Sequence, residues 1–136
     1  KMSKSELSDL SRINLTDDRD QMINKIKKAK TDPLPMPQDT NELDKRLEAK
    51  NLLGIYSSLT NSSIQNSVKN FAGKNFSEFK EILSEELVTK LEPISKEIKK
   101  LLEDKKYLDG ILLDGVEKAN TIASKKIERV KEIVGF

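Results

Sequence analysis

Residues 79–102 read FKEILSEELVTKLEPISKEIKKLL, and their apolar side chains recur every three or four positions. An α-helix makes one turn in about 3.6 residues, so this interval places the apolar side chains on one helix face. The positions are Phe79, Leu83, Leu87, Leu91, Ile94, Ile98 and either Leu101 or Leu102. Pro93 removes one backbone hydrogen bond, so we expect a single helix that bends near residues 89–93.

A second long helix is predicted over residues 106–134, after a turn at Asp104–Lys106. Gly115, Ala119 and Ala123 lie on one face at intervals of four, so a partner helix could approach closely. The stripe expected to be buried comprises Leu112, Val116, Ala119, Ala123, Ile127, Val130 and Val134.

Shorter helices are expected before this pair. One covers about residues 18–30, with Thr16 or Asp17 as its N-cap, and others cover about 43–59 and 63–71. No alternating strand pattern of useful length appears. The sequence therefore predicts an all-α protein, a helical bundle in which two long antiparallel helices form the spine.

Two residues of the 43–59 helix have open interpretations. Gly54 costs roughly 1 kcal/mol relative to Ala in a helix, so we expect close packing to favour it. Tyr56 could stack on a nucleic-acid base or be a core aromatic, and the core interpretation is favoured.

Composition limits the possible functions. The chain has 136 residues with 25 basic and 23 acidic side chains, a net charge of +2, so it is not a polycation. Nucleic-acid contact would need a local cluster, and the densest is Lys25, Lys27, Lys28 and Lys30. The alternative is that these lysines form a solvated helix face.

The sequence contains no Cys and no His. Disulfides, thiolate zinc sites, cysteine nucleophiles and histidine bases are thereby excluded, and we expect no protein-held metal site. No apolar stretch approaches membrane-spanning length and no signal peptide is visible, so we expect a cytoplasmic protein without a membrane partner.

Four short motifs occur in order along the chain. Residues 1–5 read KMSKS, residues 11–18 read SRINLTDD, residues 25–32 read KIKKAKTD and residues 51–60 read NLLGIYSSLT. Together they resemble the tryptophanyl-tRNA synthetases of bacteria and organelles, which are class I aminoacyl-tRNA synthetases. Near the end, residues 114–123 resemble the family's Gly-Ala-x-Lys-Ala-x-x-Ile-Ala pattern, with Val116 where Ala is more usual. Just beyond it, Lys126 stands where Thr is common.

The resemblance implies a role for each residue of the loop at 1–5. The family activates tryptophan with ATP, which forms tryptophanyl adenylate and releases pyrophosphate, and then transfers the tryptophanyl group to tRNA for tryptophan. Lys1 and Lys4 would stabilise the charge that develops on the departing pyrophosphate, because ammonium groups aimed there favour the transition state. Ser3 and Ser5 would donate hydrogen bonds to phosphate oxygens, and the backbone beside Met2 would pack near adenine.

The resemblance also implies a division of the chain and a set of partners. Residues 1–32 would end the catalytic region, 33–42 with their alternating prolines would be a connector, and 43–136 would form a helical domain for the anticodon end of tRNA. ATP would arrive with Mg²⁺, the enzyme would be a homodimer, and DNA would not be a partner. Lysines that could read the anticodon, or serve solubility alone, are Lys96, Lys99, Lys118 and Lys125.

The family's other signature, a His-x-Gly-His motif on a nucleotide-binding fold, cannot occur in a chain without His. We therefore expect these residues to be the C-terminal part of an enzyme and to be inactive alone, since catalysis needs its groups held on one scaffold. The alternative is a non-catalytic helical module that binds tRNA or a protein.

Overall fold

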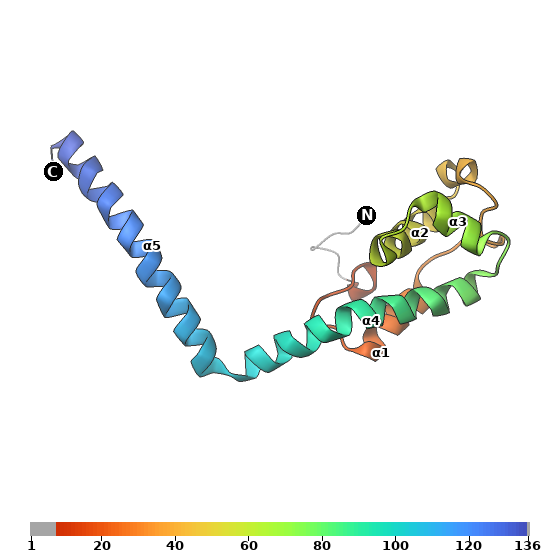
Figure 1. Cartoon of the computed structure of the whole chain (residues 1–136), viewed down its shortest axis with the longest axis horizontal. Helices are drawn as coiled ribbons and strands as arrows, with labels where there is room; N and C mark the ends of the chain where they lie inside the picture. Colours follow the sequence, from red (N-terminus) through yellow and green to blue (C-terminus); the bar gives the residue numbers. More distant parts are fainter. Residues whose placement is uncertain (1–7, 136) are drawn as a thin grey trace. The chain divides into compact units, whose positions relative to one another are not determined.

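The structure of the chain is a computed structural model that describes residues 8–135 (Figure 1). Within that range it contains five α-helices and two short 3-10 helices and no strand, so the all-α prediction is confirmed. The 3-10 helices are η1 (Asp9–Ser11) and η2 (Thr40–Asp44). The α-helices are α1 (Arg19–Lys28), α2 (Leu47–Thr60), α3 (Ile64–Phe71), α4 (Phe76–Glu103) and α5 (Lys105–Val134).

The described residues form two compact units, 8–96 and 97–135, and the boundary falls inside α4. None of the helices between residues 8 and 135 is both long and apolar enough to cross a membrane. The predicted division into residues 1–32, 33–42 and 43–136 concerns functional regions and stays a prediction.

Local hydrogen bonds decide where the helices start. Asp18, not Thr16 or Asp17, is the N-cap of α1, and its carboxylate accepts from the Gln21 amide while the Gln21 side chain accepts from the Asp18 amide. This capping box satisfies two backbone donors at once. Ser63 caps α3 by accepting from the amide of Asn66.

The core of the first unit is built around three aromatic rings. Phe71 lies edge-to-face against Tyr56 and Phe79, with ring centroids 4.9 and 4.7 Å away. Such pairs add to the gain from burying the rings. Tyr56 is therefore an aromatic residue at the boundary of the core, which agrees with the favoured interpretation of Tyr56 as a core or boundary aromatic. The other buried apolar residues of this cluster are Met22, Ile26, Met36, Leu43, Leu52, Leu53, Val68, Leu83, Leu87 and Val88.

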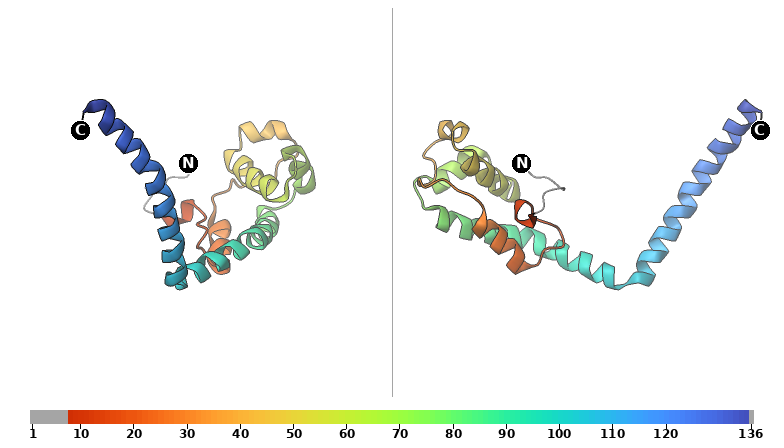
Figure 2. Two further views of the ribbon diagram at one scale, coloured as in Figure 1. Left: turned by 60° about the vertical axis from the view of Figure 1, so that its left-hand side comes forward. Right: turned by 180° about the vertical axis from the view of Figure 1, so that it is seen from behind.

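Helix α4 is continuous through Pro93, as predicted. Its first part buries Phe79, Leu83 and Leu87, and α1 lies alongside it in all views (Figure 2). The apolar face of α4 is not buried along its whole length, because Ile94 is 44% exposed while neighbouring Ser95 is buried.

The proline-containing segment, residues 33–42, packs against neighbouring parts of the chain. Met36 is 2% exposed, and its backbone exchanges hydrogen bonds with the turn after α3, from Met36 N to Lys74 O (2.8 Å) and from Gly73 N to Met36 O (3.1 Å). Arg46 binds Asp32 through two nitrogens, at 3.0 and 2.7 Å, and also donates to the carbonyl of Pro35 at 2.6 Å. A planar guanidinium suits this paired contact.

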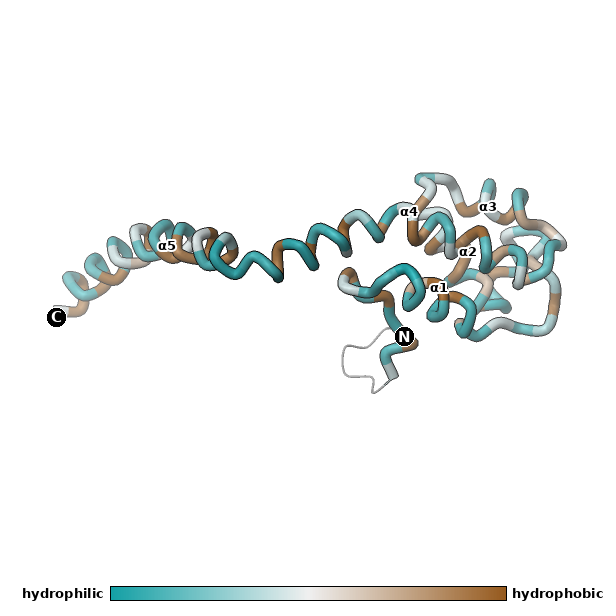
Figure 3. The backbone as a smooth tube through the Cα atoms, turned by 90° about the horizontal axis from the view of Figure 1, so that it is seen from below, coloured by the Kyte–Doolittle hydropathy of each residue, from teal (hydrophilic) through white to brown (hydrophobic). Residues whose placement is uncertain are grey.

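The apolar stripe of α5 is present but is not buried in the structure. Figure 3 shows hydrophobic positions recurring along this helix, yet α5 has no buried residue. The prediction of a buried stripe is therefore wrong for this helix as the structure describes it; Leu112 is 65% and Val130 57% exposed. Periodicity reports that a helix has an apolar face and does not report what covers that face. The antiparallel pairing of the two long helices stays a prediction.

Candidate functional site

The predicted catalytic and ATP-binding residues Lys1, Met2, Ser3, Lys4 and Ser5 lie outside the described residues. The structure does describe the chain from Ser8 onward, three positions after Ser5. The start of this stretch is held in place by a cluster of charged and polar side chains. We define this ion-pair cluster as Asp9, Arg12, Asn14, Asp17 and Lys25.

Lys25 is the centre of the ion-pair cluster. It projects from α1, and its Nζ lies 2.6 Å from Oδ2 of Asp9 and 2.6 Å from Oδ2 of Asp17. The side chains of Lys25 and Asp17 are 6% and 5% exposed, whereas that of Asp9 is 51% exposed. One ammonium thus binds a buried carboxylate and a surface carboxylate from two different points of the chain.

Asn14 and Arg12 complete the cluster. The Asn14 amide donates to Oδ2 of Asp17 at 2.8 Å, and its side-chain nitrogen donates to Oδ1 of Asp9 at 3.0 Å. The Arg12 Nε lies 3.1 Å from Oδ1 of Asp9. Two positive and two negative groups therefore balance, which lowers the cost of burying Lys25 and Asp17.

Hydrogen bonds shift the acid–base equilibria of the cluster. The hydrogen bond from Lys25, followed by that from Asn14, lowers the pKa of Asp9 below its usual value. Burial alone would lower the pKa of Lys25, but its hydrogen bonds to Asp17 and Asp9 outweigh burial, and the pKa is raised. Lys25 therefore remains an ammonium ion at neutral pH and cannot serve as a general base.

The cluster is also attached to α4. The hydroxyl of Ser95 donates to the backbone carbonyl of Asp17 at 2.8 Å, and Ser95 is only 1% exposed. Lys80, from an earlier turn of α4, donates to the carbonyls of Lys27 and Ala29 at the end of α1. Burial of the Lys80 ammonium lowers its pKa. These contacts explain why Ser95 rather than Ile94 faces inward.

Lys25 does not belong to a nucleic-acid-binding surface. Both interpretations of the predicted basic cluster placed Lys25 in solvent, and both are wrong for this residue because it is buried. Lys27, Lys28 and Lys30 are exposed, so for them both interpretations stay open. Lys96, Lys99, Lys118 and Lys125 are exposed as well.

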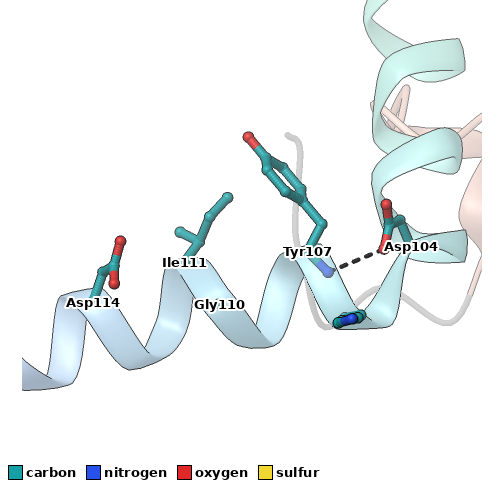
Figure 4. A pocket seen from close by; sticks show the side chains of 6 residues that line it. Asp104, Tyr107, Gly110, Ile111 and Asp114 are labelled. Atoms are coloured by element: carbon teal, nitrogen blue, oxygen red, sulfur yellow. Dashed lines mark hydrogen bonds between the residues drawn. The ribbon is translucent and has the colours of Figure 1, made fainter.

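A shallow hollow lies at the start of α5 (Figure 4). Tyr107 and Ile111 project from the same side of the helix, and the Asp104 carboxylate accepts from the Tyr107 amide at 3.0 Å. That contact caps α5, which begins at Lys105, so the turn predicted at Asp104–Lys106 is reduced to the single residue Asp104. Across residues 8–135, no group of three or more carboxylates could hold a metal ion. We assign no chemistry to the hollow.

Comparison with known proteins identifies the family. The model of the family described as class I tRNA synthetases (W and Y), where the letters stand for tryptophan and tyrosine, matches residues 1–107. The chain belongs to this family. The match begins at the KMSKS residues and includes the whole ion-pair cluster of the synthetase chain.

Curated relatives are similar in sequence to this chain along its whole length. It is 47% identical over 136 residues to a tryptophan–tRNA ligase of Mesorhizobium japonicum and 48% identical to one of Agrobacterium fabrum, covering 38% of each. A tryptophan–tRNA ligase of Rickettsia felis is 48% identical and is covered to 41%. The synthetase chain thus spans about two fifths of the length of these curated relatives.

Sequence reasoning did not find the ion-pair cluster. It treated SRINLTDD as a family motif and Asp17 as a helix cap, and it counted Lys25 among the surface lysines. One signal was available: Lys25 lies between Met22 and Ile26, on the apolar side of α1. A lysine in an apolar stripe needs a buried partner.

Proposed function

We propose that the protein containing these residues is a tryptophan–tRNA ligase, which activates L-tryptophan with ATP and transfers it to tRNA for tryptophan. The observation that carries the proposal is the identity of 44–48% to tryptophan–tRNA ligases over the entire chain. The family model alone would also allow tyrosine, because it covers both W and Y enzymes. The named relatives favour tryptophan.

In this proposal the loop at residues 1–5 binds ATP, which arrives as its Mg²⁺ complex and is a substrate. Lys1 and Lys4 stabilise the negative charge on the departing pyrophosphate, and this accelerates adenylate formation because the charge develops in the transition state. Ser3 and Ser5 donate hydrogen bonds to phosphate oxygens, and the backbone beside Met2 packs near adenine.

Residues 43–136 would form the helical domain that binds the anticodon end of the tRNA, and 33–42 would connect it to the end of the catalytic region at 1–32. The exposed lysines Lys96 and Lys99 on α4, and Lys118 and Lys125 on α5, are candidates for tRNA contact. The enzyme would act in the cytoplasm as a homodimer.

Exchange of labelled pyrophosphate into ATP tests the activation step. The assay uses the complete polypeptide that contains these residues, with tryptophan or tyrosine as the amino acid. We expect exchange with tryptophan and at most a trace with tyrosine. Exchange that depends on tyrosine would contradict the proposal, and so would exchange with neither amino acid.

A second proposal concerns the 136-residue chain by itself. It contains no His and spans about two fifths of its relatives, and its described residues up to 96 form a compact unit. Alone it would bind tRNA without making adenylate. Its affinity for tRNA should fall as salt rises, because each phosphate contact releases counterions. Adenylate formation by the isolated chain, or tRNA binding that is insensitive to salt, would refute this second proposal.

A further inference from the structure

The ion-pair cluster lies at a particular place in the chain. Asp9 follows Ser5, the last residue of the KMSKS loop, by only four positions. It is the first residue of η1, where Ser8 accepts from the Leu10 amide and the Ser11 hydroxyl donates to the Ser8 carbonyl. Any contact that fixes Asp9 therefore fixes the chain at the fourth position after the loop.

Lys25 makes that contact from a rigid base. It is held on α1 between two buried residues, Met22 and Ile26, and its ammonium is anchored by Asp17 before it reaches Asp9. Asp17 is itself held by the Ser95 hydroxyl through its carbonyl and by the Asn14 amide through its carboxylate. The segment from Asp9 to Asp17 is thus attached to both α1 and α4 by groups with little freedom.

Stability alone is a poor explanation for this arrangement. A buried ion pair contributes little net stability relative to apolar residues of the same volume, because desolvation offsets much of the attraction. What such a pair does supply is a defined geometry, since its hydrogen bonds tolerate little displacement. Here the geometry concerns the chain that follows the ATP-binding loop.

We propose that Lys25 is a positioning residue for adenylate formation, which fixes the segment after the KMSKS loop by binding Asp9 and Asp17 together. This inference rests on the proposed function for its catalytic consequence. Lys25 would not touch ATP. It would act through Asp9 and η1 on where the loop can lie, and a small misplacement of catalytic groups can reduce the rate by about 100-fold.

The mildest test is Asp9→Asn in the complete polypeptide. Asp9 is half exposed, so the substitution removes the charge contact to Lys25 while the buried Lys25–Asp17 pair remains. We expect kcat/KM for ATP in pyrophosphate exchange to fall roughly tenfold or more while KM for tryptophan stays unchanged. The matched control Asp20→Asn, an exposed aspartate of α1, should leave both values as in the wild type.

A second set of variants tests Lys25 itself. Lys25→Met should lower kcat/KM for ATP more than Asp9→Asn does, and Lys25→Arg, which keeps the charge, should recover part of the loss. Lys90→Met changes an exposed lysine on α4 and is the control. Two results would show that Lys25 does not position the segment after the KMSKS loop. One is that Asp9→Asn and Lys25→Met both leave kcat/KM for ATP unchanged. The other is that KM for tryptophan rises by the same factor as kcat/KM for ATP falls.

Hydrogen exchange measured by mass spectrometry separates this inference from the proposed function. In the complete polypeptide, Lys25→Met should speed exchange of the amides from Asp9 to Asp17, relative to Lys90→Met, by a larger factor than it speeds exchange of the α3 amides of the same unit. If the complete wild-type protein exchanges no pyrophosphate with either amino acid, the proposed function fails, and the exchange of these amides still decides whether Lys25 holds the segment. Unchanged amide exchange in Lys25→Met would overturn the inference whatever the activity.

Discussion

The Lys25 ammonium lies 2.6 Å from the Asp17 carboxylate in a region where both side chains are almost completely buried. The two residues are eight positions apart, and Asp17 precedes the helix that carries Lys25. Removing Asp17 would leave the buried ammonium with the half-exposed Asp9 carboxylate but without its buried partner, and a poorly compensated buried charge is costly.

Asp17→Ala should therefore destabilise the first unit by roughly 2–3 kcal/mol. The free energy of unfolding from a urea titration measures the effect. Asp20→Ala, in the first turn of α1 and exposed, is the control and should change stability by at most about 0.5 kcal/mol. Equal effects of the two substitutions would show that Asp17 and Lys25 are not a buried pair.

Stability should decrease in acid. The Lys25 ammonium lowers the pKa of Asp9, and the Arg46 guanidinium lowers the pKa of Asp32. A carboxylate whose pKa is lower in the folded than in the unfolded protein stabilises the fold at every pH above its unfolded pKa, which is about 4. This contribution is lost as the pH falls through the pKa of the folded state. Urea titrations between about pH 5 and pH 2 should show the loss, and the Asp32→Asn variant should show a shallower dependence. A wild-type profile that is flat over this range would contradict the ion pairs.

Phe79→Ala should be among the most damaging single substitutions in the first unit. Phe79 is 0% exposed and lies edge-to-face against Phe71, so truncation leaves a cavity in the aromatic core. We expect a loss of about 3–5 kcal/mol. Phe76→Ala, on the same helix but only half-buried, should cost clearly less. The midpoints of urea unfolding compare the two variants, and equal losses would contradict a core centred on Phe79.

Gly54 and Gly73 should respond to alanine in opposite ways. A Cβ at Gly54 would meet no atom within 4 Å, so the prediction of close packing there is wrong, and Gly54→Ala should stabilise α2 by up to about 1 kcal/mol. Gly73 has φ of +71°, and a Cβ there would lie 2.9 Å from Nε2 of Gln38, so Gly73→Ala should destabilise by about 1–2 kcal/mol. Thermal midpoints of both variants check the signs, and a shared sign would contradict the backbone geometry.

The contrast between Leu83 and Leu112 shows that the periodicity of apolar residues predicts a helix but does not predict which residues are buried. Both lie on apolar stripes of predicted helices and both helices form, yet Leu83 is 0% and Leu112 65% exposed. The 3.6-residue period depends only on local geometry, and therefore the helices could be predicted. What covers a face depends on contacts between distant parts of the chain, which a local pattern does not contain.

Asp17 shows the same limit for the candidate site. Its position before an apolar run suggested a helix cap, and an N-cap is a local feature. Asp18 performs that role, and Asp17 instead binds Lys25 and presents its carbonyl to Ser95, 78 positions away. The family motifs, by contrast, were recognisable because their residue order is preserved, whatever the fold around them.

Charging of tRNA tests the central claim most directly. The complete polypeptide, purified and free of other synthetases, is incubated with ATP, Mg²⁺, labelled amino acid and tRNA, and acid-precipitable label is counted. The account predicts that tryptophan is attached to tRNA for tryptophan, and that tyrosine is not attached to any tRNA. Attachment of tyrosine, or no attachment of tryptophan by protein whose folded state has been verified, would contradict the assignment as a tryptophan–tRNA ligase.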